Sequence, residues 1–230
     1  MTHSKERELL DLVLRQGDRS READDARLEV IAEEFRTGFE ALRDLGPCVT
    51  VFGSARFEED HRYYRLARRA AASFGEAGFA VMTGGGPGVM EAANRGARDV
   101  GALSLGCTIA LPNEQTSNPY IDREIRFRHF FARKVMLVRY SQAFVLMPGG
   151  FGTLDEVFET ATLMQTGIML DFPLVLMGTG FWNPITHFVT ESLLAETTID
   201  EADRRYFYAT DEPEAAVDHV TSRLGSPGAG

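Results

Sequence analysis

A glycine-rich turn between a strand pattern and a helix pattern constrains the fold of this chain more than any other feature. The turn, residues 147–152, follows the apolar run at 143–146, which is typical of a buried strand. Apolar residues then recur at helical spacing over residues 153–166. Glycines let a ligand approach the backbone closely, and the free N–H groups and dipole of a first helical turn favour negative charge. The stretch therefore predicts a phosphate-binding turn with the Glu156 carboxylate at its rim.

A second interpretation of the same residues needs no ligand. Thr153 and Glu156 have the spacing of a capping box, in which Thr153 is the N-cap residue and Glu156 is the third helical residue. A capping box does not require Gly149, Gly150 and Gly152, however, and each glycine costs roughly 0.5–1 kcal/mol where the backbone is regular. The glycines therefore favour a ligand site, and a catalytic role for Glu156 stays open.

Strand patterns and helix patterns alternate along the rest of the chain. Strands are expected at residues 48–52, 79–82, 103–110, 143–146, 173–177 and 206–209. Helices are expected at residues 24–45, 62–77, 132–140 and 213–224, in a segment that begins near Val89, and after Pro184. This alternation predicts an α/β fold, a Rossmann-like open parallel sheet with helices on both faces. An additional N-terminal helix should pack on the outside of the domain or against a second subunit.

One domain is expected over residues 21–224, between a flexible N-terminus at 1–20 and a flexible tail at 225–230. In the usual strand order 3-2-1-4-5, the strands at 48–52 and 143–146 are neighbours, and ligands bind beyond their carboxyl ends. This order brings Gly53 and Ser54 next to the turn at 148–153, with the glycine turn at 84–88 one strand away. These turns therefore predict one shared ligand site.

A basic segment lies between positions 123 and 139, and it either serves that site or forms a solvated face. Its basic residues are Arg123, Arg126, Arg128, Arg133, Lys134 and Arg139.

Composition excludes several classes of function. The formal net charge of −10 argues against non-specific binding to nucleic acid or to an anionic membrane surface. The charged residues 1–8 are not typical of a signal peptide, and no apolar run approaches membrane-spanning length. Cys48 and Cys107 lie in apolar runs without metal-ligand spacing, as expected for core thiols in a reducing compartment. We therefore expect a cytoplasmic protein that binds neither nucleic acid nor membrane.

The sequence lacks the motifs of the common cofactors. In the dinucleotide-binding pattern G-x-G-x-x-G read from Gly84, Val89 takes the place of the third glycine, and no Walker lysine follows a glycine turn. There is no G-x-S-x-G nucleophile elbow and no cluster of His and Cys ligands. A pyridoxal enzyme needs a Schiff-base lysine, and the chain has only Lys5 and Lys134, the latter next to Arg133. No cofactor and no metal ion are therefore expected.

Three motifs are informative when they are taken together. They are Gly-Gly-Gly-Pro-Gly-Val-Met-Glu-Ala at residues 84–92, Arg-Lys at 133–134, and Pro-Gly-Gly-Phe-Gly-Thr-Leu-Asp-Glu at 148–156. Together they resemble the LOG family, cytokinin riboside 5′-monophosphate phosphoribohydrolases that often carry the name lysine decarboxylase. The resemblance covers about residues 48–195. It implies a Rossmann-like fold, a homodimer or larger homo-oligomer, and metal-independent cleavage of the N-glycosidic bond of AMP-like nucleotides.

The resemblance also implies roles for individual residues. It makes Arg133 and Glu156 the catalytic pair. The substrate-binding residues indicated by the motifs and by the shared edge of the sheet are Gly53, Ser54, Gly85, Gly86, Glu91, Glu114, Lys134, Gly149, Gly150, Phe151, Gly152 and Thr153. The N-terminal helix and the long segment at 113–128 are similar to the larger bacterial members of the family rather than to the compact plant-type members.

The implied reaction is hydrolysis of a nucleoside 5′-monophosphate, of the AMP or N6-isopentenyl-AMP type, to the free base and ribose 5-phosphate. The phosphate is expected on residues 149–153. The Glu156 carboxylate is expected to stabilise the oxocarbenium-like ribose and to orient the attacking water, as carboxylates do in glycoside hydrolysis. Arg133 is expected to hold the substrate or the carboxylate by a bidentate contact that a lysine cannot reproduce.

Two other functions stay open at this point. Related folds carry molybdenum cofactor, so a non-catalytic nucleotide or molybdenum-cofactor carrier is the main alternative. A regulatory or scaffold oligomer with a vestigial site is the other, and the presence of Arg133, Glu156 and every motif glycine weighs against it. The sequence also leaves open the preferred base, the choice between cytokinin activation and nucleotide salvage, the size of the oligomer, and the acid that protonates the leaving base.

Overall fold

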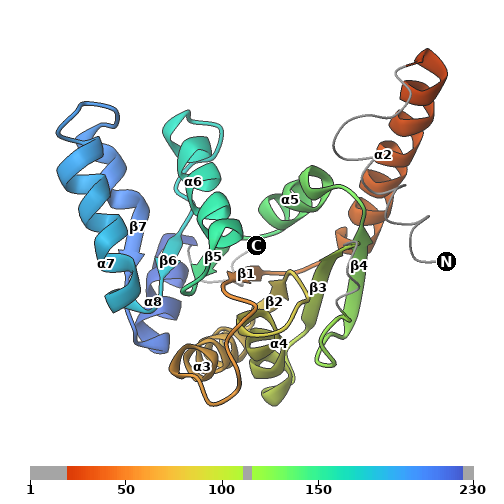
Figure 1. The fold of residues 1–230 in the computed structure, drawn as a ribbon. Helices are drawn as coiled ribbons and strands as arrows, with labels where there is room; N and C mark the ends of the chain where they lie inside the picture. The colour runs from red at the N-terminus through yellow and green to blue at the C-terminus, as the bar shows by residue number, and fades with distance from the viewer. Residues whose placement is uncertain (1–19, 111–115, 225–230) are drawn as a thin grey trace.

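A seven-stranded parallel sheet forms the centre of the computed structural model, which describes residues 20–110 and 116–224 (Figure 1). The strands are β1 (Cys48–Phe52), β2 (Ala80–Thr83), β3 (Ser104–Ile109), β4 (Arg123–Phe127), β5 (Ala143–Leu146), β6 (Leu174–Leu176) and β7 (Phe207–Ala209). Their order across the sheet is β4-β3-β2-β1-β5-β6-β7, and every neighbouring pair is parallel. The expected pairing of β1 with β5 is confirmed, and its register runs from Val49↔Ala143 to Phe52↔Leu146.

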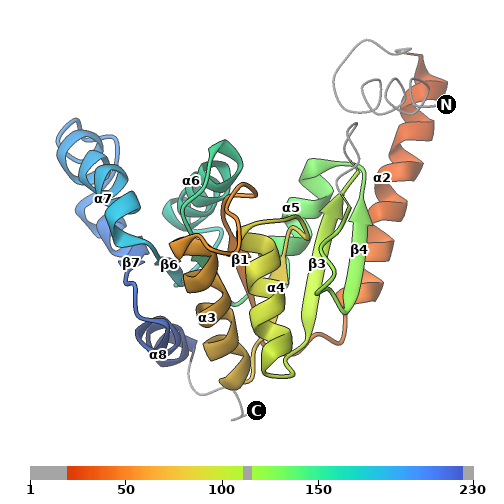
Figure 2. The ribbon, with the colours of Figure 1, turned by 60° about the horizontal axis from the view of Figure 1, so that its bottom comes forward.

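Helices cover both faces of the sheet, as the alternating pattern predicted. They are α2 (Arg21–Leu42), α3 (Arg62–Glu76), α4 (Val89–Asp99), α5 (Phe130–Arg139), α6 (Phe151–Gln165), α7 (Thr179–Phe188) and α8 (Pro213–Leu224), with a π-helix η1 (Val189–Leu193) and a 3-10 helix η2 (Glu201–Tyr206). Helices α3, α4 and α8 pack on one face, and α2, α5, α6 and α7 pack on the other (Figure 2). The flexible segments expected at the two ends lie outside the described residues, except for Ser20, which is the N-cap of α2.

Alternate residues of the strands contribute to two apolar cores, one on each face of the sheet. In β1, Val49 and Val51 belong to the core under α3, α4 and α8, whereas Cys48 and Phe52 belong to the core under α2, α5, α6 and α7. All five residues of β1 are buried, as expected for a central strand with both faces covered. Cys107 also lies in the second core, so both cysteines are buried free thiols, in agreement with the prediction.

Strand β4 differs from the sequence-based expectation, which treats this segment only as a basic run. Ile125 and Phe127 of β4 are buried in the second core, whereas Arg123, Glu124 and Arg126 are exposed. An edge strand with apolar residues on the core and charged residues in solvent has this pattern. Arg123 and Arg126 therefore belong to a solvated edge, one of the two alternatives for the basic segment.

Helix α7 begins before Pro184 rather than after it, so the predicted boundary is wrong. The Asp211 carboxylate fixes the earlier start, because it accepts hydrogen bonds from the N–H groups of Gly178 at 2.6 Å and Thr179 at 2.8 Å. Trp182 is fully buried and anchors the first turn in the core. These tertiary contacts outweigh the preference of proline for the first position of a helix.

Helix α2 packs against α5 and β4 at one side of the sheet (Figures 1 and 2). Gly38 permits a close approach, since a Cβ at this position would lie 2.8 Å from Met136 Sδ of α5. Arg123 of β4 donates a hydrogen bond to the Ala41 carbonyl at 2.8 Å. The helix thus packs on the outside of the domain, and a contact with a second subunit stays a prediction. Across residues 20–110 and 116–224, none of the helices combines the length and apolar character needed to cross a membrane.

Candidate functional site

Helix α6 begins at Phe151, inside the glycine turn, and not at Thr153. Its N-cap residue is Gly150, and no side chain among the described residues caps it. Thr153 is therefore the third helical residue, and its N–H donates to the Gly150 carbonyl at 3.0 Å. Glu156 lies in the second turn and is only 6% exposed. The capping-box interpretation of Thr153 and Glu156 is wrong, so a helix cap does not explain the buried carboxylate.

Four N–H groups of the glycine turn are available to a ligand. The N–H groups of Gly149, Gly150, Phe151 and Gly152 donate to no oxygen of the part of the chain that the structure describes. The first turn of a helix leaves such groups unpaired and carries the positive end of the helix dipole. Gly150 and Gly152 are exposed, and Phe151 is 92% exposed. The turn therefore has the properties of an anion-binding helix start.

The turns that follow β1, β2 and β5 contact one another at the carboxyl edge of the sheet. The Ser54 N–H donates to the Pro148 carbonyl at 3.0 Å, and the Val89 N–H donates to the Ser54 carbonyl at 2.9 Å. A Cβ on Gly149 would lie 2.1 Å from Thr153 Oγ1 and 3.1 Å from the Ser54 nitrogen. Glycine is therefore needed at position 149 to bring the turns together.

The Arg133 guanidinium lies against the glycine turn after β2. Helix α5 carries Arg133, and a Cβ on Gly84 would lie 2.7 Å from Arg133 Nη2. Gly85 has a φ of +74°, a conformation that favours glycine. At the end of β1, a Cβ on Gly53 would lie 2.5 Å from Val89 Cγ1. These close approaches place the guanidinium and the three turns at the same edge of the sheet.

A buried polar network fixes the turn after β2. Its centre is Asn94 of α4, which is fully buried. Asn94 makes hydrogen bonds of 2.7 to 3.0 Å with Thr83, Ser104, Leu105 and Asn118. Asn118 in turn donates to the carbonyls of Gly85 at 2.9 Å and Gly86 at 3.0 Å. Sequence reasoning missed this network, and its only signal was one polar residue among the apolar positions of a helix.

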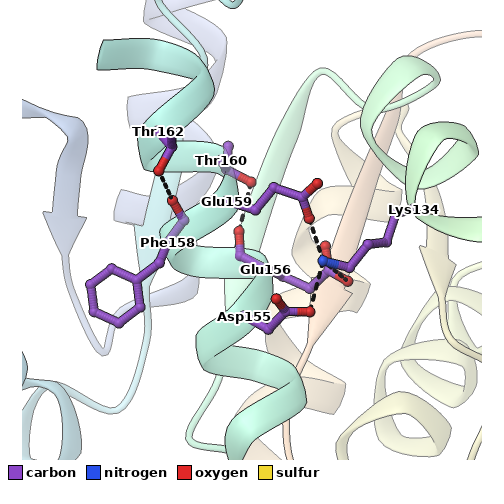
Figure 3. A network of polar contacts seen from close by, with 7 residues as sticks. All are labelled: Lys134, Asp155, Glu156, Phe158, Glu159, Thr160 and Thr162. Carbon is purple, nitrogen blue, oxygen red and sulfur yellow. Dashed lines mark hydrogen bonds and ion pairs between the residues drawn. The ribbon is translucent and has the colours of Figure 1, made fainter. Parts of the chain in front are cut away.

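Lys134 of α5 is surrounded by three carboxylates of α6 (Figure 3). Its Nζ lies 2.7 Å from Asp155 Oδ2 and 4.0 Å from Glu156 Oε1, and it donates a hydrogen bond to Glu159. Burial acts to lower the pKa of Lys134, but its hydrogen bonds to Asp155 and Glu159 outweigh burial, so the pKa is raised. The ammonium group therefore stays charged and links α5 to α6.

Glu156 and Arg133 carry opposite charges, and each has one buried polar atom without a hydrogen bond to the described residues. Within the described ranges, Glu156 Oε2 and Arg133 Nε are buried and have no partner. Burial raises the pKa of Glu156 to about 7, against the opposing effects of Lys134 and Arg133. Burial also lowers the pKa of Arg133, and the charge of Glu156 acts in the opposite direction. Unsatisfied buried charges with shifted pKa values are costly and are typical of sites that a ligand completes.

Two other predicted site residues do not join this group. Glu91 of α4 contacts α3 instead, where its Oε1 accepts a hydrogen bond from the Tyr64 hydroxyl at 2.9 Å. A contact between Glu91 and a substrate therefore stays a prediction. Glu114 lies outside the described residues.

The described residues contain no group of three or more His, Cys, Asp or Glu that could hold a metal ion. A concavity of about 500 Å³ lies among α7, η1 and η2. It shares no residue with the site at the carboxyl edge of the sheet. Its lining residues are Thr186, Val189, Thr190, Glu201, Ala202, Arg204, Arg205 and Phe207.

The seven-stranded parallel sheet with helices on both faces is a Rossmann-like α/β fold, and α6 begins with a glycine N-cap at the carboxyl edge of this sheet. The model of a family described as "Possible lysine decarboxylase" matches residues 90–220, more than half of the chain. The chain therefore belongs to this family, which is the LOG family indicated by its motifs.

Two relatives that are named as phosphoribohydrolases match about half of the chain. The cytokinin riboside 5′-monophosphate phosphoribohydrolase LOG of Oryza sativa subsp. japonica is 32% identical over 134 residues, which are 56% of this chain and 54% of the rice protein. LOG4 of Arabidopsis thaliana, which has the same activity in its name, is 32% identical over 117 residues, 49% of this chain and 53% of the plant protein. The chain thus spans about half the length of the curated relatives it matches.

Solved structures share the fold. The molybdenum cofactor carrier protein of Chlamydomonas reinhardtii superposes with a TM-score of 0.58 at 22% identity, and the match covers 78% of this chain and 98% of that chain. At this level of identity, the likeness shows the Rossmann-like fold alone.

Proposed function

We propose that this protein hydrolyses the N-glycosidic bond of nucleoside 5′-monophosphates of the AMP type and releases the free base and ribose 5-phosphate. One observation carries the proposal: α6 carries the buried Glu156 carboxylate and begins at the N–H groups of Gly150 and Gly152, and among the described residues Glu156 Oε2 and these N–H groups have no partner. Gly152 and Glu156 are separated by about 6 Å along the axis of α6. A mononucleotide has its phosphate and its glycosidic carbon at opposite ends of one ribose, so it can reach both groups.

In the proposed reaction, the 5′-phosphate accepts hydrogen bonds from the N–H groups of residues 149–152. Departure of the base from C1′ builds positive, oxocarbenium-like charge on the ribose. The ionised Glu156 carboxylate stabilises this charge and orients a water molecule, whose oxygen forms the new bond to C1′. The electron pair of the broken C1′–N bond goes to the base nitrogen, which takes up a proton, while the attacking water loses one as it becomes the hydroxyl on C1′.

Arg133 and Lys134 provide positive charge near the Glu156 carboxylate. Arg133 Nε lacks a partner among the described residues, so it is a free donor for a substrate oxygen or for Glu156. Lys134 is already held by Asp155 and Glu159, and it reduces the cost of ionising Glu156. We therefore assign a substrate or carboxylate contact to Arg133 and an electrostatic role to Lys134.

Gly149→Ala is expected to weaken phosphate recognition. The added Cβ would lie 2.1 Å from Thr153 Oγ1, so the turn must shift and its N–H groups must move. The loss of one hydrogen bond to a charged group costs about 1.5–3 kcal/mol, so we expect KM for AMP to rise at least about tenfold in steady-state kinetics.

Gly180→Ala on α7 is the matched control, because a Cβ there meets nothing within 4 Å. It should behave as the wild-type protein does. An unchanged KM for Gly149→Ala would contradict the phosphate site.

The direct test is to incubate the purified protein with AMP and to separate the products by chromatography. We expect adenine and ribose 5-phosphate in equal amounts, and we expect adenosine, which lacks the phosphate, to be a poor substrate. The alternative is a non-catalytic nucleotide or molybdenum-cofactor carrier, and it predicts binding without base release. A panel of monophosphates with and without an isopentenyl group then identifies the preferred base.

We also propose that the protein forms a homo-oligomer in the cytoplasm. Large apolar side chains are exposed on two helices of the site, and they are Phe130, Phe131 and Val135 of α5 and Phe151 and Phe158 of α6. In this proposal they form the contact surface between copies of the chain, a role that exposed apolar patches commonly have. The buried free thiols of Cys48 and Cys107 suit a reducing compartment. Light scattering is expected to give a dimer or a larger assembly, and a monomer would contradict the oligomer.

A further inference from the structure

Helix α2 buries a carboxylate against the start of α5. Glu34 of α2 is 8% exposed. Its Oε1 accepts hydrogen bonds from the backbone N–H groups of Arg128 and His129, the latter at 3.3 Å, and its Oε2 contacts His129 Nδ1. A buried carboxylate is costly unless hydrogen bonds or charges satisfy it, and within the described part of the chain the partners of Glu34 are residues 128 and 129.

Glu34 binds the backbone of the two residues that immediately precede α5. The N-cap residue of α5 is His129, whose own side chain makes no capping hydrogen bond. A carboxylate at this position satisfies N–H groups at the helix start and interacts favourably with the helix dipole. Glu34 lies 95 residues before His129 in the sequence. The start of α5 is therefore held by a distant helix rather than by its own residues.

The same contact fixes the position of Arg133. The Arg133 N–H donates to the His129 carbonyl at 3.2 Å, so the two residues are one helical turn apart. Three residues beyond Arg133, Met136 packs closely on Gly38 of α2. Helix α2 thus contacts α5 on both sides of Arg133, whose guanidinium lies against Gly84. A shift of α5 relative to α2 would move this guanidinium away from the site.

We propose that Glu34 is a positioning residue for Arg133, an inference that rests on the proposed hydrolysis of AMP. Glu34 acts through His129 and the backbone of α5 and does not touch the substrate. The residue lies outside the region 90–220 that the family model matches, so the motifs of the family do not include it. The N-terminal helix is thereby part of the catalytic arrangement of this chain.

The experiment is a double-mutant cycle on AMP hydrolysis. Glu34→Ala is expected to lower kcat by roughly 100-fold, the effect of a displacement near 1 Å at a reacting group. KM for AMP should stay close to the wild-type value, because the phosphate-binding turn belongs to α6. In an Arg133→Lys background, the same substitution should have little further effect, because residues that act as a unit are not additive. Glu33→Gln, an exposed neighbour on α2 paired with Arg36, is the control and should leave kcat unchanged.

Melting temperatures show whether each variant is folded at the assay temperature. If Glu34→Ala is not folded there, Glu34→Gln enters the same cycle, since Gln keeps an oxygen for the two backbone N–H groups but loses the charge. An unchanged kcat, or equal factors of loss in the wild-type and Arg133→Lys backgrounds, would overturn the positioning role alone. A wild-type protein that releases no adenine from AMP would overturn both the proposed function and this inference.

Discussion

Glu156→Gln is expected to abolish nearly all base release from AMP while the protein stays folded. The neutral amide cannot stabilise positive charge on the ribose, and the loss of such a group lowers kcat by roughly 1,000-fold. Gln is nearly isosteric with Glu, and the capping role that would otherwise explain Glu156 is absent because α6 begins at Phe151. Steady-state release of adenine measures the effect. A variant with near-normal kcat would remove Glu156 from the reaction.

Glu156→Gln is expected to be less active than the wild-type protein but more stable at pH 8. Burial raises the pKa of Glu156 from 4.5 to about 7. At a pH between these two pKa values, the folded protein therefore keeps a proton on Glu156 that the unfolded chain has released. The stability of the wild-type protein therefore falls as the pH rises through this window, by up to about 3 kcal/mol. Gln does not ionise, so thermal unfolding at pH 8 should give Glu156→Gln the higher melting temperature, with little difference at pH 4.

Activity of the wild-type protein should follow the ionisation of the same carboxylate. The proposed reaction needs the charged form, so kcat/KM for AMP is expected to rise as the pH increases through about 7.

Glu159→Gln is the matched control for Glu156→Gln, because Glu159 shares Lys134 with Glu156 but its side chain is 40% exposed. We expect only a few-fold loss of kcat for this control. Equal losses for the two variants would mean that the environment of Lys134, and not Glu156, limits the reaction.

Arg133→Lys is expected to lower kcat/KM for AMP by about 100-fold although the charge is kept. The planar guanidinium offers donors in a fixed arrangement, and an ammonium group at the end of a flexible chain does not reproduce a bidentate contact. The Arg133 Nη2 group fills the space against Gly84, and a lysine side chain would leave that space empty. Kinetics with AMP give the size of the loss.

Arg139→Lys is the control for this substitution. Arg139 lies on the same helix and is exposed, with its guanidinium carbon 5.5 Å from the centre of the Phe39 ring. Its replacement should leave kcat/KM unchanged. If Arg133→Lys were as active as the control, the contact assigned to Arg133 would be wrong.

The fold class could be predicted because its signals are local. The strands β1 and β5 are buried on both faces, so each appears in the sequence as a short continuous apolar run. Strand β4 carries three exposed charged residues, and its two buried residues were too few to mark it as a strand. The start of α7 depends on Asp211, which follows β7 and has no local relation to the helix it caps.

The glycines of the site could be predicted, but the supports of the site could not. The spacing of Thr153 and Glu156 is the same whether the helix begins at Phe151 or at Thr153, so the sequence did not separate a cap from a buried carboxylate. The network around Asn94 and the contact between Glu34 and His129 join residues that are distant in the sequence. Such contacts follow from the packing of whole helices, which no local pattern encodes.

A crystal structure of Glu156→Gln with AMP shows directly where the phosphate and the ribose bind, because the slow variant keeps the nucleotide intact. We expect the 5′-phosphate on the N–H groups of Gly150 and Gly152, with C1′ next to the amide of residue 156 and the Arg133 guanidinium in contact with the ligand or that amide. A phosphate bound elsewhere, or these N–H groups turned toward protein carbonyls with the nucleotide absent, would contradict this expectation.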